Sequence, residues 1–298
     1  MAQSVSGVCK LCGKHGSLTK EHIPAKGGYK GISYRVQVLG GDKVLEGGRG
    51  DQYQNGFHAP VLCEDCNNNT GAWYGSEFAN WTKWGLKLLD EMRKPEPSLV
   101  PAYEGRPARI AKQVVSTMIA SAQEGFADHN PHLRDFVLDP YRTLSPYELR
   151  LTTYLCPTRT GRSTGVASVM NLLEERSEPH VLIEFALQPF GYVLTLGGEP
   201  FDSRPVSIAW FGSCGYDERR MVDLPHIPIL PTHEALPCDY RTQYEIRRDV
   251  IVNILTEQEH PTPHEEAVQI MESGKGPEVF AAHGEDWSLD FSTGLVSE

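Results

Sequence analysis

The 298-residue sequence has no apolar run approaching the roughly 20 residues that a membrane-spanning helix needs. Its first residues, MAQSVSGVCKLCGKHG, also lack the apolar core of a secretory signal peptide. These two absences argue against a membrane partner and against export. We therefore expect a soluble protein located in the cytoplasm.

Cysteine is scarce, and the odd number of seven does not suit a complete set of disulfides. Four of the seven form two C-x2-C pairs, and in a reducing compartment this pattern favours metal over disulfides. Four thiolates suit tetrahedral Zn²⁺, and a site filled by four cysteines braces a fold without activating water. We predict a structural zinc site with the ligands Cys9, Cys12, Cys63 and Cys66.

Acidic residues are rare in the first fifty residues, where three Asp and Glu accompany eight Lys and Arg. This end therefore carries a local charge of +5, although the net charge of the whole chain is −11. A phosphate backbone responds to the local field, so the basic end is compatible with a nucleic-acid partner. The alternative is a solvated, lysine-rich surface.

The periodicity of the apolar residues, and the prolines and glycines that interrupt it, suggest two domains. The segment SYRVQVLGGDKVLEGG (33–48) predicts a β-hairpin that turns at Gly40 and Gly41. From Trp73 to about Met92, apolar residues recur at helical spacing and predict one core-facing stripe, formed by Tyr74, Phe78, Trp81, Leu88 and Met92. The prolines of KPEPSLVP (94–101) stop this helix. We place a boundary there, between domains at 1–94 and 102–298.

The second region predicts a buried helix over 106–126, followed by short β-rich runs without helices between them. These runs indicate an antiparallel sheet, with strands within 149–156, 165–170, 180–188, 191–196 and 205–211. Extended coil is predicted over 224–237, a helix around 243–257, and another helix after the cap residue Thr262. The expected fold class is α+β, with a mainly antiparallel sheet in the larger C-terminal domain.

The insert between the cysteine pairs begins TKEHIPAKGG, which sets a carboxylate, Glu21, beside an imidazole, His22. The order C-x2-C, then Glu-His-Ile-Pro, then C-x2-C-Asn resembles the ββα-metal, or HNH, endonucleases. The resemblance is closest to their zinc-braced branch, which includes resolvases of the endonuclease VII type. It covers about residues 8–75 and implies an N-terminal ββα-metal domain.

The resemblance implies that His22 is the general base, a role that suits an imidazole near neutral pH. It also implies that Glu21 and Asn67 hold a catalytic Mg²⁺ or Mn²⁺ through oxygen atoms. Asn68 is the second choice for the asparagine position, and Asn69 competes with both. Adjacent strand residues face opposite ways, so Glu21 and His22 share a site only if the backbone turns there. The alternative for the asparagine row is that it caps a helix.

The basic residues around the insert are the predicted phosphate contacts, namely Lys20, Lys26, Lys30, Arg35 and Lys43. His15 and His58 lie near the cysteine pairs and are alternative metal ligands.

The resemblance implies a metal-dependent endonuclease that nicks or cuts DNA, with RNA as the other substrate, in a mobile element or in defence against phage. The C-terminal domain would select substrate, sense a signal, restrain the active site, or bind a protein partner or a second copy. A different hypothesis is a non-catalytic zinc module that binds nucleic acid or protein. A third makes the C-terminal region the enzyme, through His226, His233, Cys214 or Cys238, but no nucleophile motif surrounds them.

Overall fold

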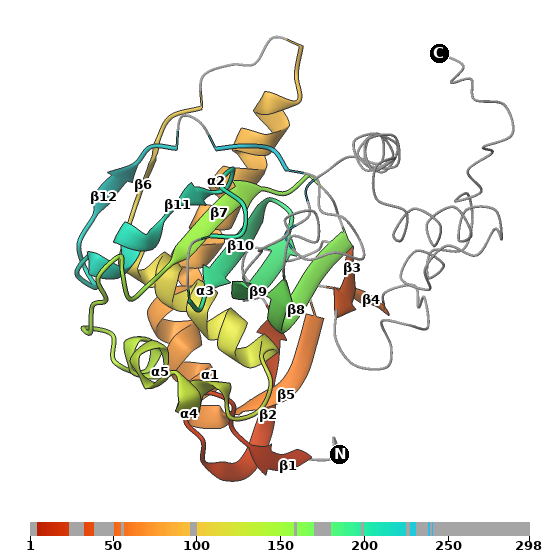
Figure 1. Ribbon diagram of the computed structural model, residues 1–298, viewed down its shortest axis with the longest axis vertical. Coiled ribbons are helices and arrows are strands. Elements are labelled where there is room, and N and C mark those ends of the chain that lie inside the picture. Colours follow the sequence, from red (N-terminus) through yellow and green to blue (C-terminus); the bar gives the residue numbers. More distant parts are fainter. Residues whose placement is uncertain are drawn as a thin grey trace, which may run out of the picture. The chain divides into compact units, whose positions relative to one another are not determined.

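The structure, a computed structural model, describes residues 5–23, 33–38, 51–54, 57–95, 100–157, 160–169, 180–197, 200–224, 227–230, 238 and 240 (Figure 1). All of them belong to one compact unit, formed by Met1–Val38 and Gly50–Tyr240. The Gly40–Gly41 turn, the helices predicted at 243–257 and after Thr262, and most of the coil predicted at 224–237 lie outside the described residues.

The N-terminal part is a three-stranded antiparallel sheet followed by a helix. The sheet has the order β1-β2-β5, with β1 at Val5–Val8, β2 at His15–Ile23 and β5 at Phe57–Cys63. Strand β5, which contains Pro60, lies at the edge of this sheet, where proline is tolerated. Helix α1 (Glu64–Thr70) begins as β5 ends.

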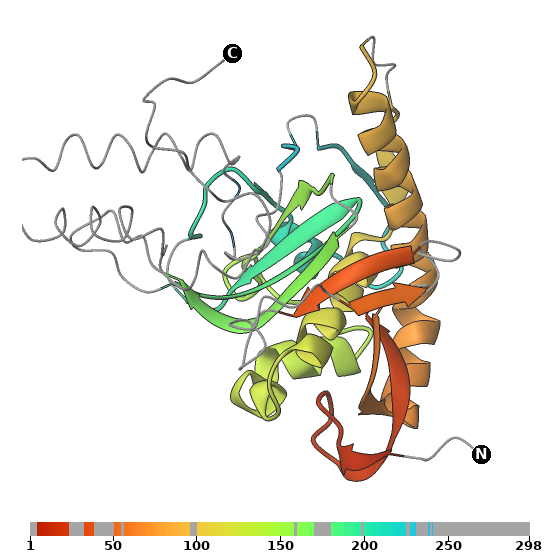
Figure 2. The same ribbon diagram turned by 90° about the vertical axis from the view of Figure 1, so that its right-hand side faces the viewer.

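Helix α1 continues without a break into a longer helix. A π-helical turn, Gly71–Gly75, joins it to α2 (Ser76–Met92), and the three run as one column in Figure 2. The predicted helix is confirmed, and Tyr74, Phe78 and Trp81 are buried as expected. The buried stripe then continues through Leu89, so Met92, in the last turn, is exposed, contrary to the prediction.

The larger sheet has seven strands in the order β11-β7-β10-β9-β8-β3-β4. Their bounds are β3 Ser33–Val38, β4 Asp51–Gln54, β7 Leu151–Leu155, β8 Thr160–Val169, β9 His180–Leu187, β10 Phe190–Thr195 and β11 Val206–Ser207. Every neighbouring pair is antiparallel except β3 and β8, which run parallel. The α+β class and the mainly antiparallel sheet are therefore confirmed.

One strand prediction needs correction, and another is only partly covered by the described residues. The segment predicted as a strand at 205–211 is extended only over Val206–Ser207, and a 3-10 helix at Ala209–Ser213 then buries Phe211 in the core. Of the hairpin predicted at 33–48, the first part forms β3, which pairs antiparallel with β4, and residues 39–48 lie outside the described residues. The chain between the two cysteine pairs thus adds two strands to the larger sheet.

Helices α2 and α3 (Pro107–Ser121) cover one face of this sheet (Figure 1). Trp81 of α2 is the centre of the contact: its ring stacks on Phe190 with centroids 4.7 Å apart, and its Nε1 donates to the Tyr192 hydroxyl at 2.9 Å. Gly85 lies so close that a Cβ there would meet the Phe190 ring at 2.2 Å. The described residues before and after the boundary predicted at 94–101 therefore pack in one core. The division of the whole chain into domains at 1–94 and 102–298 stays a prediction.

The remaining short elements of the described chain surround this core. They are β6 (Tyr103–Gly105), which pairs with β12 (Arg220–Val222), and the helices α4 (Phe126–His129) and α5 (Pro131–Leu138).

The opposite sheet face holds a buried polar group. Glu184 of β9 accepts hydrogen bonds from Arg162 at 2.6 Å and from the hydroxyl of Tyr154 at 2.7 Å. Tyr154 reaches it across β10 because residue 191 is glycine, where a Cβ would lie 1.9 Å from the tyrosine ring. The other oxygen of Glu184 accepts from the backbone amide of Cys238 at 2.8 Å, which ties Cys238 to the sheet.

Candidate metal centre and the residues beside it

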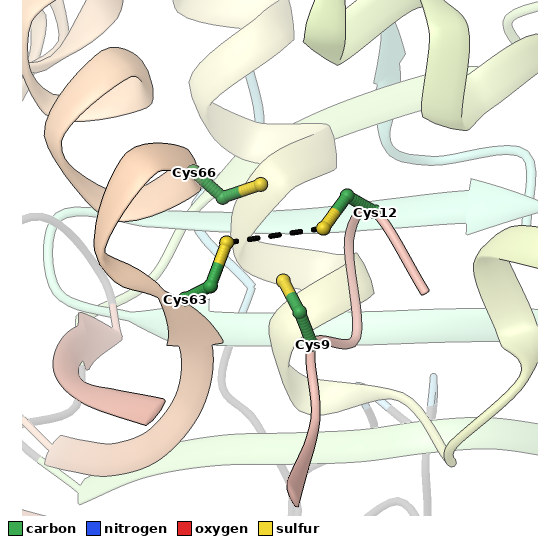
Figure 3. Close-up of side chains that lie close together, drawn as sticks. All are labelled: Cys9, Cys12, Cys63 and Cys66. Carbon is green, nitrogen blue, oxygen red and sulfur yellow. Dashed lines mark hydrogen bonds between the residues drawn. The ribbon is translucent and has the colours of Figure 1, made fainter. Parts of the chain in front are cut away.

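Four cysteine side chains converge at one end of the three-stranded sheet (Figure 3). Cys9 and Cys12 come from the turn between β1 and β2, whereas Cys63 ends β5 and Cys66 lies in the first turn of α1. All four sulfur atoms lie within 4.8 Å of one another, and those of Cys12 and Cys63 are 3.8 Å apart. Four sulfurs at about 2.3 Å from a tetrahedral zinc would be separated by about 3.8 Å. The cluster is therefore able to hold a metal ion.

Backbone hydrogen bonds shape the first cysteine pair. Gly13 adopts φ +72°, and its amide donates to the Cys9 carbonyl at 2.8 Å, which closes the turn. The register between β2 and β5 shifts after Thr19, so Val61 has no partner in β2. Its carbonyl instead accepts from the amide of Lys10 at 3.0 Å. Because Lys10 follows Cys9 and Val61 precedes Cys63, this hydrogen bond links the two cysteine pairs.

The thiols interact strongly with one another. A hydrogen bond with the Cys66 side chain lowers the pKa of Cys9 to about 4, against the opposing effect of burial. The same bond raises the pKa of Cys66, and burial raises it further. Burial also raises the pKa of Cys12. Because a metal ion binds thiolates, occupation of this cluster is expected to release protons.

Asn67 is fixed by a contact with β2. Its side-chain nitrogen Nδ2 donates to the Thr19 hydroxyl at 2.9 Å, and that hydroxyl donates to the Leu62 carbonyl at 3.1 Å. Asn68 and Asn69 point into solvent as exposed residues of α1. The N-cap of this helix is Cys63, and no side chain caps it. The alternative in which the asparagines cap the helix is therefore wrong.

Glu21 and His22 both lie within β2, where they pair with Ala59 and His58 of β5. The pairing continues through Ile23, so the backbone turn that would let adjacent residues share a site does not occur between Glu21 and His22. Because adjacent residues of a strand alternate between its two faces, positions 21 and 22 belong to opposite faces of β2. His22 is half-buried.

The other predicted site residues are described only in part. Lys20 lies in β2, and Arg35 lies in β3, where it pairs with Gln52 and Thr160. Lys26, Lys30 and Lys43 lie outside the described residues. His15 begins β2 as an exposed residue and does not belong to the cysteine cluster, and His58 lies in β5.

The C-terminal alternative finds little support in the described chain. Cys214 and Cys238 are both buried, and burial raises the pKa of each thiol, which opposes formation of a reactive thiolate. The Sγ of Cys214 lies 3.7 Å from the carbonyl oxygen of Trp210, as expected for a structural thiol. His226 and His233 lie outside the described residues.

Comparisons of the chain with models of protein families, with curated proteins and with solved structures found no match. Across the described ranges, no helix combines the length and apolar character needed to cross a membrane.

Proposed function

We propose that the chain is a metal-dependent endonuclease of the HNH, or ββα-metal, class that hydrolyses phosphodiester bonds of DNA. One observation carries the proposal: the antiparallel pair β2 and β5 leads directly into α1 around the cysteine cluster. Glu21 and His22 lie on the first strand, and Asn67 lies on the helix. This is the order of elements and side chains that a ββα-metal site requires.

The cysteine cluster would hold a structural Zn²⁺. Its four sulfur ligands would fill the tetrahedral coordination of zinc, so no position would remain for a reacting water. The ion would join the β1–β2 turn to the start of α1. Its role is then to hold the strands and the helix in place, and the chemistry falls to other residues.

The residues beside the cluster fit a second, harder cation. A carboxylate at position 21 and the amide oxygen of Asn67 are the kind of ligands that Mg²⁺ and Mn²⁺ prefer. Asn67 is held to Thr19, and position 21 lies two residues further along the same strand, a distance of about 7 Å. When bound, such a cation supplies positive charge beside the scissile phosphate.

His22 would take a proton from the attacking water, since an imidazole is partly unprotonated near neutral pH. It is the penultimate residue of β2 and lies on the face opposite position 21. For His22 and position 21 to act on one phosphate, the substrate must approach the end of this strand, where both faces are within reach. Basic residues of the first fifty would contact the neighbouring phosphates.

The test is cleavage of supercoiled plasmid with Mg²⁺ or Mn²⁺ by wild-type protein, Asn67→Ala and Asn68→Ala. Because Asn67→Ala removes a metal ligand, it should slow cutting by about 10–100-fold or more. The exposed Asn68 is the matched control and should keep near wild-type activity. Equal activity of all three proteins, each with its zinc retained, would remove Asn67 from the site.

A non-catalytic zinc module that binds nucleic acid or protein is the second candidate. The position of Glu21 and His22 as consecutive residues of β2, each paired with a residue of β5, favours it. In that case DNA binding without cutting is expected from the wild type, and replacement of His22 by alanine leaves the affinity unchanged.

The larger sheet would control access to the site. Strands β3 and β4 come from the insert between the cysteine pairs, and β3 pairs with β8 of the C-terminal region. A substrate, a signal or a partner that moves this sheet would act on the insert directly. A role in phage defence or in a mobile element belongs to the same proposal.

A further inference from the structure

Thr19 lies between the cysteine cluster and position 21, and its hydroxyl has two hydrogen-bond partners. It donates to the carbonyl of Leu62 on the neighbouring strand at 3.1 Å. It accepts from Nδ2 of Asn67 on α1 at 2.9 Å. Thr19 therefore links the first strand, the second strand and the helix of the ββα unit within one short chain of hydrogen bonds.

The direction of these bonds decides how the Asn67 amide is oriented. A threonine hydroxyl has one proton, which is used on Leu62, so towards Asn67 it acts as an acceptor. Only the nitrogen of an amide donates, so Nδ2 must face Thr19 and the oxygen Oδ1 must face away from it. The reverse orientation would take the hydroxyl proton away from the carbonyl of Leu62, a fully buried residue.

We infer that Thr19 is a positioning residue, which holds Asn67 so that Oδ1 is the atom presented to a hard divalent cation. The inference rests on the proposed function, because it takes Asn67 as a ligand of the catalytic metal. Thr19 itself touches neither metal nor substrate. Its β-branched side chain suits the strand. Its hydroxyl determines which atom of the Asn67 amide, on α1, faces the cation.

The experiment measures Mn²⁺ affinity on the full-length, zinc-loaded chain by a titration that follows the EPR signal of free Mn²⁺. Thr19→Val keeps the branched shape and removes the hydroxyl, whereas Thr19→Ser keeps the hydroxyl. Thr82→Val is the control, because it makes the same change at a buried threonine whose hydroxyl bonds only the Phe78 carbonyl within α2, whereas Thr19 is half-buried. Zinc content and melting temperature are recorded for each protein.

Thr19→Val is expected to raise the dissociation constant for Mn²⁺ by about 10–100-fold, the usual effect of losing a residue that orients a metal ligand. Thr19→Ser should recover most of the affinity, and Thr82→Val should not change it. In plasmid cleavage, Thr19→Val should need more Mn²⁺ for half-maximal rate and approach the wild-type rate at saturation.

A Thr19→Val protein with a lower melting temperature but wild-type Mn²⁺ affinity would show a purely structural role and overturn the inference, leaving the proposed endonuclease intact. A wild type that binds no Mn²⁺ and cuts no plasmid would overturn both. If the wild type binds Mn²⁺ without cutting, the affinities of the variants still decide the role of Thr19.

Discussion

The ammonium group of Lys10 lies 2.6 Å from the carbonyl oxygen of Ala122, a residue 112 positions later in the chain. It also donates to the carbonyl of Ala120 at 3.1 Å. These carbonyls lie at the C-terminal end of α3, where backbone acceptors lack partners within the helix and the helix dipole favours a cation. Because Lys10 lies between Cys9 and Cys12, this contact docks the candidate metal centre onto the main core.

Replacing Lys10 by methionine should lower the free energy of unfolding by about 1–2 kcal/mol, since two charge-assisted hydrogen bonds at a helix end are lost. Lys14→Met, in the same turn but exposed, is the control and should change little. Chemical denaturation measures both. Because Lys10 is not a ligand, both proteins should keep their metal; zinc loss in Lys10→Met would mean that the docking is needed to form the cluster.

Removal of metal should destabilise the whole described unit, because the cluster joins β1, β2, β5 and α1. Elemental analysis is expected to find one zinc per chain in the wild type, and a chelator should lower the melting temperature. Cys12→Ser should lose the zinc, whereas Cys214→Ser, which changes a cysteine outside the cluster, should retain it. Full zinc content in Cys12→Ser would contradict the four-cysteine site.

Glu184→Gln should be strongly destabilising, by about 3–5 kcal/mol, because it leaves the charge of Arg162 buried without its carboxylate. The matched change is Glu104→Gln, which breaks an exposed pair with Arg219 and should cost less than about 1 kcal/mol. Urea denaturation of the two variants gives the comparison. Similar losses in both would show that the buried pair contributes no more than a surface one.

A fragment that ends at Pro95 should not fold. It would expose Trp81, which is fully buried against Phe190 and hydrogen-bonded to Tyr192, two residues that the fragment lacks. Circular dichroism and the dispersion of amide resonances in NMR spectra would report this. A fragment with dispersed resonances and bound zinc would instead support an independent N-terminal domain.

Local patterns made some features predictable. The spacing within each C-x2-C pair identified all four members of the cysteine cluster, and helical periodicity identified α2 and α3. Strands β7, β9 and β10 of the larger sheet were recognisable because they are buried along most of their length and are rich in aliphatic, β-branched and aromatic residues.

Features that depend on distant partners were not predictable. Strand β3 pairs in parallel with β8 more than 100 residues away, and no local periodicity encodes such a choice of neighbour. The position after Cys66 pointed to Asn67, but the orientation of its amide depends on Thr19, 48 residues earlier. A site shared by Glu21 and His22 required the backbone to turn between them, yet pairing with β5 keeps this segment extended.

The most direct test of the account is nicking of supercoiled plasmid in Mn²⁺ by the full-length wild type, His22→Ala and His15→Ala, with zinc measured in each. His15 is the matched control, because it lies in the same strand as an exposed residue outside the cluster. The account predicts metal-dependent nicking by the wild type and His15→Ala, and a loss of about 100-fold or more in His22→Ala with its zinc retained. Equal nicking by all three proteins, or none by any of them, would contradict it.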